Sequence, residues 1–136
     1  MPPPPDSALR FQPLAVLRSI LAIIVGYVVF AGGLMGAVLL AWGGLVEGPS
    51  AALVPISMVG MLLSIVLGGA VAGVLAGRRP GGHGLAVGAI ALIVLVVGTF
   101  ASNALEPDWY RIVGAVVSLP LAYLGSELAG KKVGAR

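Results

Sequence analysis

Residues 59–79 read VGMLLSIVLGGAVAGVLAGRR, an uncharged run that ends at two arginines. A transmembrane helix needs about 20 mostly apolar residues. The stretch therefore predicts a helix that crosses a lipid bilayer and ends where the arginines reach water. Glycine, serine and alanine recur along it at every fourth position, which places them on one side of the helix.

The composition of the whole chain agrees with this interpretation. Of its 136 residues, 59% are hydrophobic and 10% are charged, whereas about a quarter of an ordinary soluble domain is charged. With 8 Lys and Arg and 5 Asp and Glu, the chain cannot cover a water-facing surface. The sequence therefore predicts a small polytopic membrane protein.

The spacing of the charges predicts four spans in one domain, 14–132. Segments apolar on every side favour helices over the alternating strands of a membrane barrel, so the expected fold is an all-α four-transmembrane-helix bundle. The expected helices lie near 14–46, 52–77, 84–104 and 109–130. A proline-rich, disordered tail is expected over 1–13 and a short basic tail over 133–136.

The basic residues predict the orientation. Seven of the eight lie before the first span, between the second and third, or after the fourth: Arg10, Arg18, Arg78, Arg79, Lys131, Lys132 and Arg136. The positive-inside rule predicts that those segments, and hence both termini, lie in the cytoplasm. The expected location is the inner membrane of the cell. Trp42, Trp109 and Tyr110 then belong at the outer interface, where amphipathic aromatic residues are favoured.

Rows of small residues predict how the helices pack. Residues four apart share a helix face, and small residues there let two backbones approach closely in lipid. A further row, Gly32, Gly36 and Gly44, lies on the first helix. The rows serve packing within the bundle or, alternatively, a homodimer or a contact with a membrane-protein partner. The predicted packing residues are Gly60, Ser64, Gly68, Gly69, Gly73, Gly77, Gly114, Ser118, Ala122, Ser126 and Gly130.

The second and fourth spans also resemble each other in order. Val59-Gly60 corresponds to Val113-Gly114, Ser64 to Ser118, and 75–79 to 128–132. This similarity raises the hypothesis of two tandem helical hairpins in the same orientation, a parallel repeat.

The stretch 68–79, followed by His83, Gly84 and Gly88, resembles a pattern in small bacterial four-helix membrane proteins of unassigned function. The resemblance implies a four-helix inner-membrane protein and supplies no active residues to carry over.

Little in the sequence indicates chemistry. There is no cysteine and one histidine, which excludes thiol nucleophiles and multi-histidine metal sites. No carboxylate or histidine lies deep in a span to serve as a base, so we expect no enzyme activity and no cofactor. The positive charge is explained by basic residues that set the topology, so we expect no nucleic-acid binding. The expected partner is the lipid bilayer.

We therefore expect a non-enzymatic integral membrane protein that serves as a packing, assembly or accessory module. The alternative is a small channel or transporter, with Glu127 or the outer cluster over 99–108 on its path. Glu127 pairs with Lys131 in the ordinary interpretation, and turns inward in the functional one. The remaining candidates are Asn103 and Arg111, while Pro55 and Pro120 are expected to kink their helices.

Overall fold

The computed structural model describes residues 13–41, 53–77, 79–100 and 107–134, and within them every regular element is a helix. All four helices are long and apolar enough to cross a membrane. The predicted all-α four-helix bundle is therefore confirmed. The helices are α1 (Pro13–Ala41), α2 (Val54–Ala76), α3 (Pro80–Thr99) and α4 (Asp108–Gly134).

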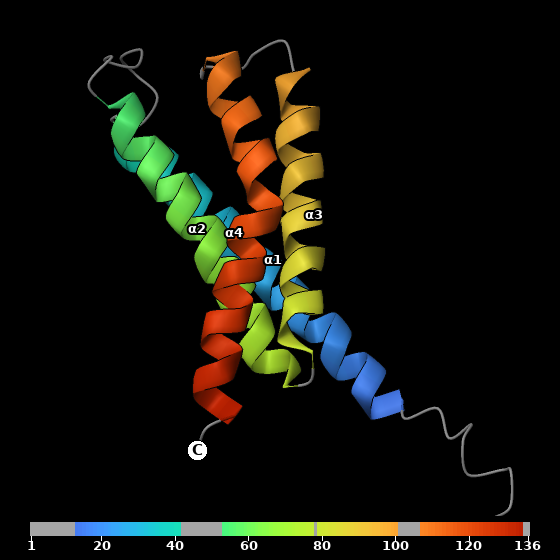
Figure 1. Cartoon of the computed structure of the whole chain (residues 1–136). Coiled ribbons are helices and arrows are strands. Elements are labelled where there is room, and N and C mark those ends of the chain that lie inside the picture. The colour runs from blue at the N-terminus through green and yellow to red at the C-terminus, as the bar shows by residue number, and fades with distance from the viewer. Residues whose placement is uncertain (1–12, 42–52, 78, 101–106, 135–136) are drawn as a thin grey trace, which may run out of the picture.

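Consecutive helices run in opposite directions (Figure 1). The first residue of α1, the turn between α2 and α3 and the last residues of α4 lie at one end of the molecule, drawn at the bottom. We call this the terminal end and the opposite one the loop end. Helix α2 is central and contacts the other three, whereas α1 and α4 do not meet within the described residues.

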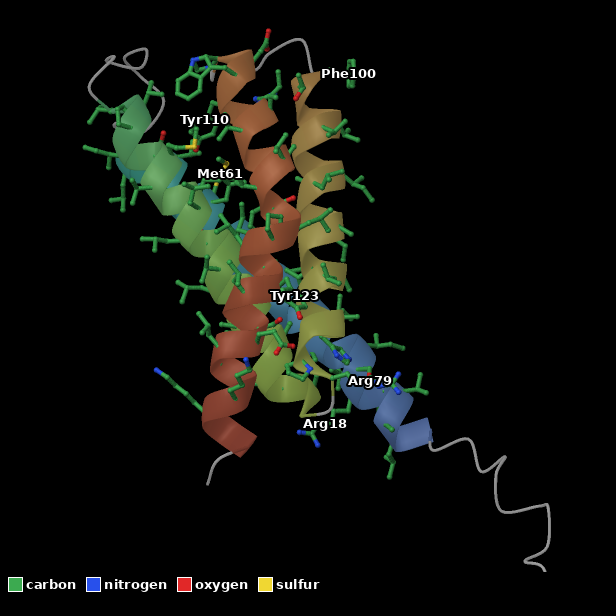
Figure 2. All side chains as sticks on the ribbon, in the orientation of Figure 1. Arg18, Met61, Arg79, Phe100, Tyr110 and Tyr123 are labelled. Atoms are coloured by element: carbon green, nitrogen blue, oxygen red, sulfur yellow. The ribbon has the colours of Figure 1, made fainter. Side chains whose placement is uncertain are left out.

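The pair α1–α2 and the pair α3–α4 diverge toward the loop end, and the first turns of α1 extend away from the other helices at the terminal end (Figure 1). Large side chains fill part of the widening space, and Met61 and Tyr110 lie there between α2 and α4 (Figure 2). Phe30, Ile65 and Leu95 join them in one buried cluster. Large buried residues therefore fill part of the space between the two diverging pairs.

Helix α3 begins earlier than predicted. The sequence interpretation placed its start near residue 84, with His83 in a loop, but the helix starts at Pro80. Proline suits the first position of a helix, because its φ is already helical and its missing amide would have no partner there. The preceding Arg79 has a left-handed φ of 50°, which turns the chain sharply between α2 and α3.

The other bounds differ less. Helix α4 continues to Gly134 and takes Lys131 and Lys132 into its last turn, where positive charge favours the helix dipole. Pro55 lies in the first turn of α2, so it starts that helix rather than kinking it. Pro120 does lie inside α4. The predicted residues 42–46 of the first helix and 1–12 of the tail lie outside the described residues.

Candidate functional site

One row of small residues on α2 faces α1. A Cβ atom built on Gly68 would lie 2.7 Å from the carbonyl oxygen of Gly26, and one built on Gly33 would meet the side chain of Ser64. Gly60 has the same relation to Ala37, with 2.5 Å between the two Cβ positions. No larger side chain fits at these contacts, so small residues set the distance between α1 and α2.

The neighbouring row on α2 faces α4. A Cβ atom on Gly69 would overlap the backbone of Ala122, and one on Gly73 would lie 2.7 Å from the carbonyl oxygen of Ser126. Gly125 of α4 fits equally tightly against the backbone of Val66. The two adjacent rows of α2 thus serve two different neighbours inside the same chain.

The predicted row on α4 also lies in the α3 contact. A Cβ atom on Gly88 would lie 2.9 Å from the carbonyl oxygen of Ser118, and one on Gly84 would lie 2.6 Å from that of Ala122. At the two ends of the row, Gly114 lies against Met61 and Gly130 against Pro80.

Gly77, which its spacing predicts to be a helix-packing residue, lies at the end of α2. It follows the last residue of α2, with a left-handed φ of 69°, and its amide donates to the carbonyl of Gly73. Glycine adopts this conformation without steric cost and is the usual residue just past a helix end. The atom nearest a Cβ there is Nη2 of Arg18, at 2.8 Å. Gly77 therefore ends α2 rather than joining a row between two helices.

The predicted row on α1 is not used within the bundle. A Cβ atom on Gly32 or Gly36 would meet nothing within 4 Å, and Gly44 lies outside the described residues. Gly26 and Gly33 make the contacts instead. They are seven residues apart with Phe30 between them, so they do not belong to a row with four-residue spacing, although residues seven apart also share one helix face.

The four buried serines are all satisfied within their own helices. Each hydroxyl donates to a backbone carbonyl three or four residues earlier, at 2.7–2.9 Å: Ser57 to Val54, Ser64 to Gly60, Ser118 to Ala115 and Ser126 to Tyr123. None of these four hydroxyls is therefore an unsatisfied donor available to a transported solute.

Tyr110 links two helices near the loop end. Its hydroxyl donates to the carbonyl oxygen of Ser57 at 3.1 Å, and the residue is 2% exposed. Tyr110 is therefore buried between helices at the loop end rather than exposed to lipid, because its hydroxyl has a partner inside the bundle. Its place at the outer interface stays a prediction. Trp109 beside it is 52% exposed, and Trp42 lies outside the described residues.

Arg111 is half-buried in α4, and Nη1 of its guanidinium donates to the carbonyl of Gly98 on α3. It borders a cavity of about 340 Å³ between α1, α3 and α4, whose other walls include Tyr27, Phe30 and Leu34. Thr99 donates to the carbonyl of its own Leu95 at 2.9 Å. Residues 101–106, which include the candidate Asn103, lie outside the described residues.

Glu127 turns toward α3. A Cβ atom on Gly81 would lie 2.6 Å from Oε1 of Glu127, so the carboxylate covers the first turn of that helix. Among the described residues, Glu127 and Lys131 form no ion pair. The glycine at position 81 leaves the space that the carboxylate occupies. The side chain is half-buried.

In the described part of the chain, no three His, Asp or Glu side chains gather closely enough to hold a metal ion. The described residues form an all-α bundle of four helices, each long and apolar enough to cross a membrane, with small residues at the contacts between them. Comparison with models of known families, with curated proteins and with solved structures finds no match.

Proposed function

We propose that the chain is a non-enzymatic integral membrane protein of the inner membrane, with both termini in the cytoplasm. It acts by helix association, as an assembly or accessory module. The associating surface is the outer face of α1 around Gly32 and Gly36, and its expected partner is a second copy of the chain.

The observation that carries the proposal is the open glycine pair on α1. Gly26, Gly33, Gly60, Gly68, Gly69 and Gly73 each meet another helix, whereas Gly32 and Gly36 meet nothing. Exposed Val28 and Met35 flank the pair, both 60% exposed. Glycines four apart between larger residues let a second transmembrane backbone approach closely.

The limited burial of α1 supports the same surface. Only 17% of its most apolar 18-residue window is buried inside the molecule, against 39% for α2. The helix contacts α2 along its length and α3 more sparsely. A surface centred on one helix can pair with its own copy about a two-fold axis.

Hydrogen bonding favours this role over the small channel or transporter. Transport needs polar groups that exchange partners with a passing solute, whereas the four buried serines donate to their own backbones. The cavity beside Arg111 is walled mainly by apolar and aromatic side chains.

Disulfide cross-linking in native membranes tests the proposal, because the chain has no cysteine of its own. Met35→Cys should give covalent dimers under mild oxidation. Ile93→Cys, equally exposed on α3 at 58%, should give only background. Adding Gly36→Leu to Met35→Cys should reduce the dimer several-fold, because the larger side chain separates the two backbones.

Affinity purification with mass spectrometry runs in parallel, to capture a different membrane-protein partner. Two results together would overturn the proposal. Met35→Cys would form no more covalent dimer than Ile93→Cys, and Gly36→Leu would lose no protein that copurifies with the unchanged chain.

A further inference from the structure

Three basic side chains from two helices and the turn between α2 and α3 surround one hollow at the terminal end. Arg18 of α1, Arg79 before α3 and His83 of α3 line a space of about 740 Å³. The rest of the lining is Leu14, Ala15, Ser19 and Ala76, so no carboxylate faces into it. Arg18 and Arg79 lie at the same end of the molecule (Figure 2).

Two of the three basic side chains, Arg18 and His83, contact the backbone. Nε of Arg18 donates to the carbonyl oxygen of Leu75 at 2.7 Å, near the C-terminal end of α2. The ring of His83 lies against the turn, with Nδ1 3.2 Å from the carbonyl oxygen of Arg79. Within the described residues neither arginine forms an ion pair, so both charges remain available to an external anion.

An apolar groove continues from this hollow. It has a volume of about 490 Å³, shares Leu14 and Arg18 with the hollow, and runs between α1 and α2. Its walls are aliphatic: Leu17, Leu21, Ala22 and Val25 of α1 with Val74 and Leu75 of α2. From Leu14 to Val25 the helix rises roughly 16 Å at about 1.5 Å per residue, about half of a hydrocarbon core of roughly 30 Å.

We propose that the hollow and the groove together bind one anionic phospholipid. The phosphate headgroup lies between Arg18 and Arg79, beside His83, and an acyl chain lies in the groove along α1 and α2. Charge complementarity selects the headgroup, because basic pockets between transmembrane helices attract anionic lipids. The groove, which spans one leaflet, selects a lipid over a free phosphate ion.

Native mass spectrometry of the full chain in detergent tests the proposal. Dioleoyl phosphatidylglycerol should remain bound more strongly than dioleoyl phosphatidylcholine, which has the same chains and no net charge. Arg79→Gln, which removes an exposed side chain, should weaken phosphatidylglycerol binding roughly fivefold, and the double variant with Arg18→Gln should weaken it further.

The matched control is Lys131→Gln with Lys132→Gln, which removes two charges from the same end but outside the hollow. This pair should leave phosphatidylglycerol binding close to that of the unchanged chain. A titration with inorganic phosphate forms the second arm, and millimolar phosphate should not displace the lipid.

Equal retention of the two lipids would overturn the proposal. So would a loss of phosphatidylglycerol binding in the double lysine variant as large as that in Arg79→Gln. Displacement by inorganic phosphate would overturn it too, since the site would then recognise an anion without a chain. Because Arg18 contacts α2, the conclusion depends on Arg79→Gln if the double variant does not fold.

Discussion

At single positions, the effect of a glycine depends on the atom that faces its missing side chain. Gly69 faces the backbone of Ala122, which cannot move without shifting α4. Gly32 faces open space. Both belong to rows with four-residue spacing, so the spacing alone cannot distinguish a glycine that packs from one that is open.

We expect Gly69→Ala to lower the free energy of unfolding by about 1–3 kcal/mol, because the added methyl overpacks a backbone contact. Gly32→Ala should leave it unchanged or raise it by up to about 1 kcal/mol, because alanine favours the helix. Denaturation in mixed micelles measures both. Equal stability of the two variants would contradict the packing described for α2 and α4.

Tyr110 is the residue whose role the sequence did not reveal, since a tyrosine beside a tryptophan at a span end resembles an interface anchor. Tyr110→Phe should cost about 0.6 kcal/mol, typical of a hydrogen bond between transmembrane helices. Trp109→Phe, at an exposed neighbour, should stay within about 0.5 kcal/mol. The same denaturation assay compares them, and a larger loss for Trp109→Phe would argue against the Tyr110–Ser57 link.

At the scale of elements, the charges predicted the spans well because burial of charge in lipid is costly wherever the helices pack. The spacing of small residues identified helix faces but not their partners. Two adjacent rows on α2 look alike in sequence, yet one faces α1 and the other α4. That assignment depends on tertiary arrangement, which local periodicity does not contain.

Helix ends were predicted less well than spans. The predicted start near residue 84 leaves 80–83 between two helices, yet these residues form the first turn of α3. Proline is compatible with a helix start, and Gly81 makes room for Glu127 of α4. Proline and glycine, which are common in loops, thus mark here the start of α3 where it packs against α4.

The end of α2 gives a prediction at this scale. Gly77→Ala should lower the free energy of unfolding by about 1–2 kcal/mol, because a Cβ atom is disfavoured at its left-handed φ of 69°. Gly82→Ala is the matched control, since a Cβ there meets nothing within 4 Å and the residue lies in a helix. Destabilisation of similar size in both variants would show that the helix end does not depend on Gly77.

At the scale of the whole molecule, the hypothesis of tandem hairpins gains support from the central contact. Counting back from the aligned Leu75 and Leu128, Gly69 corresponds to Ala122 and Gly73 to Ser126. These equivalent residues contact each other, as residues near a two-fold axis do. The equivalence is incomplete, since α2 meets α3 whereas α1 does not meet α4 within the described residues.

Within the described residues, α1 does not meet α4. On its inner side the divergence leaves the cavity bordered by Arg111. Gly32 and Gly36 lie on the outer side of α1, where a Cβ atom would meet nothing within 4 Å. The helix that departs from two-fold symmetry thus also carries the surface proposed for association.

Orientation in the membrane is the last property at this scale, and it rests on charge. The terminal end carries Arg18, Arg79, Lys131 and Lys132, and in the sequence Arg111 is the one basic residue assigned to the other side. The positive-inside rule then predicts that the terminal end lies in the cytoplasm. Single cysteines in this cysteine-free chain can report which side each end faces.

We expect Gly82→Cys to react with a membrane-impermeant maleimide only after the cells are permeabilised, and Asp108→Cys to react in intact cells. Both positions are exposed, so accessibility does not depend on unfolding. Val116→Cys, 70% exposed but within the apolar part of α4, should react in neither condition because lipid covers it. Labelling of Gly82→Cys in intact cells would show the opposite orientation. The proposed phospholipid site would then lie in the outer leaflet, with the same contacts forming it.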